Sequence, residues 1–185
     1  MYWLIAGLVI FFGVHIFSTF RTVREKVTQR LGEKRYKAGY SLLAVAGFIL
    51  IAIGVSKAEP VSLWEPAEWG RYAVVWFMPF AFILLAAAFI PSNFRRFTAH
   101  PMLWSVTLWA LLHLLANGNL TGLILFGAFG LYAVHAMSSQ NARGVRPSQF
   151  RRPLFNDAAV VVAGLILYWV FLHFHAKLFG VPVIY

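Results

Sequence analysis

Six long apolar stretches alternate with short polar segments along the chain. A helix needs roughly 20 residues to cross the hydrocarbon core of a bilayer. The stretches that meet or approach this length lie at residues 2–20, 38–56, 72–90, 101–116, 120–138 and 157–176. This pattern predicts an all-α fold, a polytopic transmembrane bundle of about six helices, in one domain that covers residues 1–185.

Turn and small residues predict how some of these helices pack. The three residues 117–119, Asn-Gly-Asn, leave room only for a tight connection, so the fourth and fifth spans are expected to be antiparallel. Glycine lets helix backbones approach closely in a membrane. We therefore expect Gly47, Gly54, Gly127 and Gly130 to be close-packing positions between helices.

The basic residues predict the orientation in the membrane. Thirteen of the sixteen Lys and Arg residues follow the first, third or fifth span. Cytoplasmic loops accumulate Lys and Arg, so these segments are expected in the cytoplasm and both termini in the periplasm. Residues 21–37 combine basic side chains with Val23, Val27 and Leu31 at helical spacing, which predicts a helix along anionic headgroups.

Composition narrows the possible chemistry. The chain is 61% hydrophobic and 12% charged, so a water-soluble core of this length is excluded. The membrane accounts for the net charge of +10, and we expect no nucleic-acid partner. Cysteine is absent, which excludes disulfides, thiolate nucleophiles and sulfur-ligated metals.

Histidines are the ionisable residues that fall inside the predicted spans. His135, His173 and His175 lie near span ends, where a side chain reaches the interface. His15 and His113 have mostly apolar neighbours, and a buried imidazole needs partners from another helix or a metal. Two alternatives stay open for this pair, namely hydrogen bonds between helices and ligation of a haem iron from both faces.

A polar corner precedes the fourth span. Arg95 and Arg96 stand shortly before His100, and Pro101 begins the helix. Two arginines suit anionic groups such as lipid phosphates, haem propionates or a cofactor carboxylate. A plain cytoplasmic anchor is the competing interpretation.

Three motifs resemble the NnrU family of membrane proteins over nearly the whole chain. They are HIFSTFR at 15–21, LGEKRYKAGYSL at 31–42 and HPMLWSVTLWALLHLLANGNL at 100–120. The resemblance implies a multi-pass protein of the bacterial inner membrane, linked to nitrite and nitric oxide reduction. Related proteins include 15-cis-zeta-carotene isomerase, a haem b protein, and this relation implies haem b with His15 and His113 as ligands. The isomerase has a cysteine where this chain has Ala110, so a thiolate ligand is excluded there.

Three functions therefore compete. The first is a haem b protein that acts on an apolar polyene or handles a small gaseous ligand such as nitric oxide, with Arg95 and Arg96 near the propionates. The second is a non-enzymatic factor that assembles or supports respiratory reductases. The third is a membrane methyltransferase, for which Asp157 is the one acid that the last span offers, at its start. A transporter ranks lower because the spans lack carboxylates apart from Asp157 and show no inverted repeat.

Overall fold

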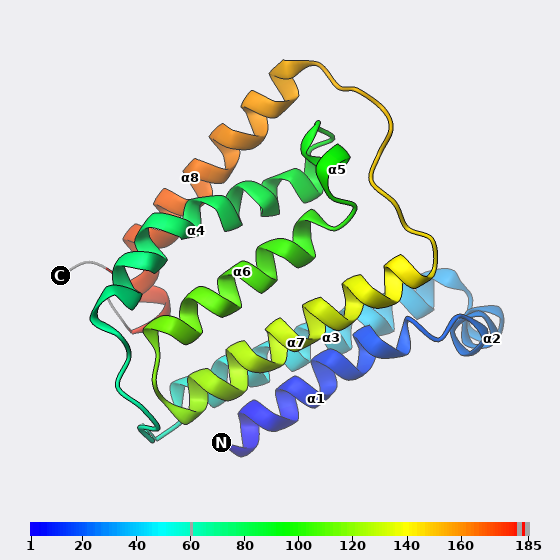
Figure 1. The fold of residues 1–185 in the computed structure, drawn as a ribbon. Coiled ribbons are helices and arrows are strands. Elements are labelled where there is room, and N and C mark those ends of the chain that lie inside the picture. Colours follow the sequence, from blue (N-terminus) through cyan, green and yellow to red (C-terminus); the bar gives the residue numbers. More distant parts are fainter. Residues whose placement is uncertain (60, 181–182, 184–185) are drawn as a thin grey trace. The chain divides into compact units, whose positions relative to one another are not determined.

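The computed structural model describes residues 1–59, 61–180 and 183, and within them every regular element is a helix. The chain divides into two compact units, Met1–Val61 and Ser62–Tyr185, each described here by itself. Figure 1 shows the elements, which are α1 (Tyr2–Phe17), α2 (Arg21–Leu31), α3 (Glu33–Ser56), α4 (Glu68–Phe89), α5 (Phe94–Phe97), α6 (Pro101–Ala116), α7 (Leu120–Ala142) and α8 (Leu154–Phe179). The all-α prediction is confirmed.

Four of the described helices, α3, α4, α7 and α8, are long and apolar enough to cross a membrane. The bent pair α1 and α2 makes a fifth candidate if it is counted as one span. The helix α6 is apolar but has only 16 residues, so a total of six spans stays a prediction. Its bounds are those predicted, whereas α3 begins five residues before the predicted start, where an ion pair of 2.7 Å joins Glu33 to Lys37 across the first turn.

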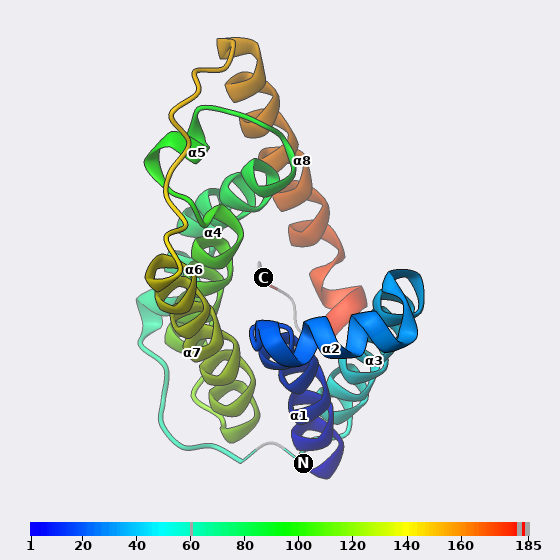
Figure 2. The ribbon, with the colours of Figure 1, turned by 90° about the vertical axis from the view of Figure 1, so that its right-hand side faces the viewer.

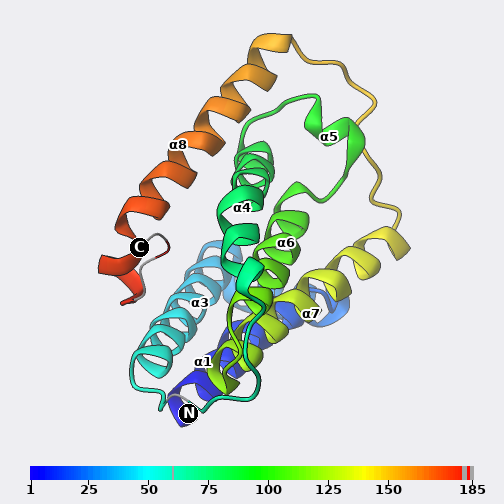
Figure 3. The same ribbon diagram turned by 60° about the vertical axis from the view of Figure 1, so that its left-hand side comes forward.

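In the first unit, α1 and α3 pack side by side through glycine (Figure 3). A side chain at Gly54 would collide with the backbone of Leu4, and one at Gly47 with the backbone of Phe11. Residues late in α3 thus meet residues early in α1, so the two helices are antiparallel. The prediction of close packing is confirmed at Gly47 and Gly54. Gly7, which meets the α3 backbone, was not predicted.

The basic segment after α1 is helical, as predicted, over Arg21–Leu31. It turns by 92° away from α1, and none of its residues is buried. A break at Gly32, whose φ of 81° suits glycine, separates it from α3. A helix that leaves an apolar helix at nearly a right angle has the geometry of one lying along the headgroups.

In the second unit, α4 packs against both α6 and α8, and α6 packs in turn against α7 (Figure 2). The main buried cluster joins α4 to α6 through Val74, Met78, Ala81 and Leu112. Close packing is confirmed at Gly130, which lies against Ala110, whereas a Cβ at Gly127 would meet open space, so that prediction is wrong. Glycine in a uniformly apolar helix carries no sign of which face meets a neighbour.

The connection between α6 and α7 is the tight turn predicted at residues 117–119. Asn119 caps α7 by accepting a bond of 2.7 Å from the Gly122 amide. The Gly118 carbonyl accepts bonds from the amides of Leu63, at 2.7 Å, and Trp64, at 3.1 Å. The loop before α4 therefore lies against this turn, so two segments predicted on the same membrane face do lie together.

The other end of this unit is joined by a second set of polar contacts. Asp157, in the first turn of α8, accepts bonds of 2.7 Å from both the amide and the side chain of Asn93. The Asn93 side chain also exchanges two bonds with the backbone of Arg152. These contacts tie the start of α8 to the connection between α4 and α5.

Candidate functional site

His15 lies near the end of α1 and is half-buried within the first unit. Its Nδ1 lies 2.6 Å from the carbonyl oxygen of Phe11, one helical turn earlier. Because a carbonyl oxygen only accepts hydrogen bonds, Nδ1 must carry the proton, which leaves the ring's lone pair on Nε2. The ring lies against those of Phe11, at 4.3 Å between centroids, and Tyr40 of α3, at 5.4 Å.

His113, in the last turn of α6, has the same local geometry. Its Nδ1 donates a bond of 2.8 Å to the carbonyl oxygen of Trp109, so its lone pair is also on Nε2. The ring packs against Phe126 of α7, at 4.8 Å between centroids, and against Trp109, at 5.3 Å. His113 thus sits within an aromatic cluster of the second unit.

The structure also brings His175 of α8 to His113, with ring centroids 6.4 Å apart and planes within 25° of parallel. From the sequence, His175 was expected to reach the interface, and this neighbour was not predicted. The two residues lie on different helices, and no local motif links them. The only sign in the sequence was that the fourth and the sixth predicted spans each contain histidine.

The remaining histidines of the spans have different settings. His135 is exposed on α7. His173 is exposed too, yet it donates from Nδ1 to the Trp169 carbonyl oxygen at 3.1 Å, as His15 and His113 do with their own helices. The bond therefore fixes the tautomer without by itself marking a ligand. His15 and His113 belong to different units, and their use as a pair stays a prediction.

The two arginines before α6 have separate roles. Arg95 donates from Nε to the Ala87 carbonyl oxygen at 3.0 Å and from Nη2 to that of Ala88 at 2.6 Å. It thereby satisfies carbonyl groups at the C-terminal end of α4. Arg96 is exposed on the short helix α5. Of the two, Arg96 has the more accessible guanidinium.

His100 forms the polar corner that the sequence indicated, and only 7% of its surface is exposed. Its Nε2 donates to Oδ1 of Asn141, at the end of α7, over 2.8 Å. Both residues line a cavity of about 360 Å³ together with the polar side chains of Thr98 and Ser138. His100 was a candidate from the sequence, whereas Asn141, which is 41 residues away, was not predicted.

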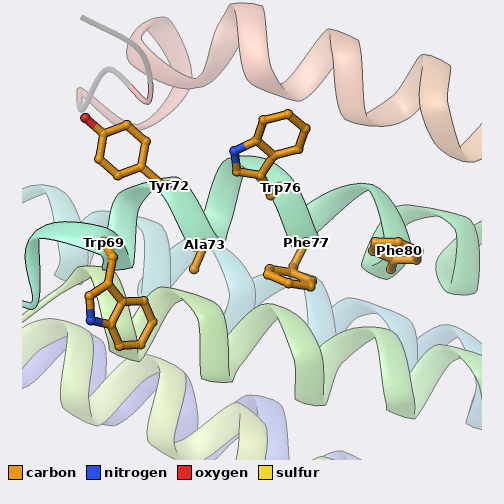
Figure 4. A pocket seen from close by; sticks show the side chains of 6 residues that line it. All are labelled: Trp69, Tyr72, Ala73, Trp76, Phe77 and Phe80. Carbon is orange, nitrogen blue, oxygen red and sulfur yellow. The ribbon is translucent and has the colours of Figure 1, made fainter.

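An aromatic surface covers part of α4. The helix bears a shallow depression of about 510 Å³ whose lining is almost entirely apolar. Figure 4 shows Tyr72 and Trp76 on one side of the helix and Trp69 and Phe77 on the other. Sequence spacing alone could have found this surface, because aromatic residues recur there every three or four positions; its full lining is Trp69, Tyr72, Ala73, Trp76, Phe77 and Phe80.

The described residues do not bring together enough side chains to hold a metal ion by themselves. Residues 1–59, 61–180 and 183 contain no group of three or more His, Asp or Glu side chains that would hold a bare ion. A haem iron differs, because the porphyrin supplies four nitrogen ligands and the protein needs only one or two.

Comparison with known proteins gives one match. The family model described as NnrU protein matches residues 3–183, and thus runs through both compact units. Neither the curated proteins nor the solved structures contain a match to the chain.

Proposed function

We propose that this chain, which belongs to the NnrU family, is a multi-pass inner-membrane protein that binds one haem b. The axial ligands in this proposal are His15 and His113. The chain has no cysteine for thioether attachment, so the haem would be held noncovalently. Its role would lie in nitrite and nitric oxide reduction or in isomerisation of an apolar polyene.

The observation that carries the proposal is that both histidines combine a fixed tautomer with a partly buried setting among aromatic rings, whereas His173 makes the same bond but is exposed. Histidine ligands of metals almost always donate their other ring proton to a carbonyl, a carboxylate or water, which orients the ring and raises its basicity. His15 and His113 each make such a bond with a carbonyl of their own helix, at 2.6 and 2.8 Å. In the neutral ring the lone pair then lies on Nε2, which is the atom that would bind iron in this proposal.

Other residues of the chain would assist in defined ways. Bound haem b would supply a redox-active iron that can take a small gaseous ligand. The exposed guanidinium of Arg96 suits a propionate, whereas Arg95 already bonds to two carbonyl oxygens of α4. The aromatic surface of α4 would offer an apolar polyene a face on which to pack.

A specific observation also favours the second candidate, a non-enzymatic factor for assembly or support of respiratory reductases. The His113 ring is packed among Trp109, Phe126 and His175, and its Nδ1 has a backbone partner. A histidine in that setting can act purely as a packing residue. Under this alternative, the protein purified from its native membrane would be colourless.

The deciding experiment is an absorption spectrum of the purified full chain, oxidised and reduced, with pyridine-haemochrome quantification. We expect a b-type Soret band that His15→Ala and His113→Ala each remove or shift. His173→Ala is the matched control, because His173 makes the same helical bond but is exposed. A wild type without haem refutes the proposal, as does wild-type haem content and spectrum in both ligand variants.

A further inference from the structure

The cavity beside His100 has a chemistry that the proposed haem function does not use. It lies in the second unit, where α6 begins and α7 ends. We propose that this cavity binds one anionic phospholipid. The phosphate would lie at a rim of arginines, the glycerol and ester oxygens beside Ser138 and His100, and the acyl chains along the apolar flank of α6 and α7.

The charge around the cavity selects an anion. No acidic residue lines it. Arg146 donates from Nη1 to the carbonyl oxygens of Asn141, at 2.9 Å, and Val145, at 3.0 Å, so this guanidinium is held beside a lining residue. Unlike Arg95, which uses both Nε and Nη2, Arg146 makes these bonds through Nη1 alone. Arg143 is fixed one turn after Ser139 by a bond of 2.6 Å to the Ser139 hydroxyl. Arginines fixed in this way suit phosphate oxygens, and basic pockets between membrane helices bind anionic lipid headgroups.

The polar part of the cavity suits the linker region of a lipid. Ser138 carries a hydroxyl and Asn141 an amide, and both can donate to ester oxygens. His100 is fixed by its bond to Asn141 and by a backbone bond to the Thr98 hydroxyl at 3.0 Å. Hydrogen bonds thus join Thr98, His100 and Asn141, whereas Ser138 lies exposed beside them.

The apolar part of the cavity points to a lipid rather than a free phosphate. Trp104 and Val134 line it and are 48% and 49% exposed. The same faces of α6 and α7 continue with Leu111 and Leu131, one or two turns deeper and 55% and 76% exposed. A soluble phosphate would not contact this apolar surface, whereas the two acyl chains of a phospholipid would pack against it.

The depths of these groups match a lipid leaflet. The rise of a helix is about 1.5 Å per residue, so Arg143 lies about 7 Å beyond Ser138 along α7. The headgroup layer on one side of a bilayer is roughly 5 to 8 Å thick. A phosphate at Arg143 and Arg146 therefore leaves its ester groups near Ser138 and its chains near Val134.

The test uses the full chain in detergent after delipidation, with native mass spectrometry and thermal melting as readouts. The probes are dioleoyl phosphatidylglycerol, dioleoyl phosphatidylcholine and glycerol 3-phosphate. We expect one retained phosphatidylglycerol that raises the melting temperature, and weaker retention of phosphatidylcholine. Arg146→Gln should weaken phosphatidylglycerol retention by about fivefold, the effect of one basic residue at an anionic surface. Lys57→Gln, at an exposed lysine directly after α3, is the control and should leave phosphatidylglycerol retention unchanged.

A second variant tests the cavity itself. Ser138 is exposed at the cavity mouth, so Ser138→Phe fills the space without disturbing a buried position, and it should abolish retention of the lipid. Equal retention of the two lipids refutes the proposal, as does wild-type retention in both Arg146→Gln and Ser138→Phe. Stabilisation by glycerol 3-phosphate equal to that by phosphatidylglycerol would assign a soluble phosphate instead. Haem content, measured in the same samples, should not change, so this proposal and the haem proposal can fail separately.

Discussion

Removal of the Asp157 carboxylate should release the start of α8 from the connection between α4 and α5. Both carboxylate oxygens accept bonds of 2.7 Å from Asn93, one from the backbone amide and one from the side-chain amide. Asp157→Ala leaves both donors without this partner. Asp157→Asn is the more selective change. Its amide keeps one acceptor oxygen but turns an N–H donor toward the Asn93 side chain, which is itself a donor there.

The magnitude follows from the number and kind of bonds. A hydrogen bond to a charged group contributes roughly 1.5 to 3 kcal/mol. Two such bonds are lost in Asp157→Ala, but the group is only half-buried, so water compensates in part. We expect a loss of about 2 to 4 kcal/mol in the free energy of unfolding for Asp157→Ala and about half of that for Asp157→Asn.

Thermal melting of the purified protein, followed by tryptophan fluorescence, measures this loss. At about 2 to 4 °C per kcal/mol for a chain of this size, Asp157→Ala should melt roughly 4 to 16 °C below the wild type. Glu68→Ala removes an exposed acid from the first turn of α4 and is the control, expected to melt near the wild type. If Asp157→Ala melts with the wild type, the carboxylate does not join these segments, and a chemical role such as that of the methyltransferase hypothesis becomes the better explanation.

Three further predictions concern packing, capping and orientation. Gly54→Ala should lower the stability of the first unit by about 1 to 3 kcal/mol, because the added methyl group overpacks the contact with α1. Gly127→Ala places its methyl group in open space and should raise helix stability by up to about 1 kcal/mol. Melting curves that rank the two variants the other way would contradict the packing. Asn119→Ala should cost about 1 kcal/mol in the same assay by removal of the α7 cap, and an unchanged melt would show that the cap is dispensable. Reporter fusions after Arg30 should behave as cytoplasmic and those near Trp64 as periplasmic, and the reverse pattern would overturn the predicted orientation.

Candidate residues could be found from the sequence only where their chemistry is unusual for their surroundings. His15 and His113 were recognisable as imidazoles among apolar neighbours, and His100 as a polar residue before a helix-starting proline. Asn141 and His175 were not, because an asparagine near a helix end and a histidine near an interface are ordinary in a membrane protein. The packing of α7 on α6 brings Asn141 to His100, and the packing of both α6 and α8 on α4 brings His175 to His113.

The sequence by itself determined where the long helices lie, to within five residues of their ends, because a backbone in lipid must satisfy its hydrogen bonds internally and hydropathy marks where it does so. The tight turn at residues 117–119 and the helix from Pro101 to Ala116 are set by local chemistry of this kind. Tertiary structure decided which faces meet. These helices are apolar on all sides, so no stripe of polarity distinguishes Gly54, which packs against α1, from Gly127, which meets open space. Contacts such as Asp157 with Asn93 join residues 64 positions apart, and only the packing of one helix on another brings them together.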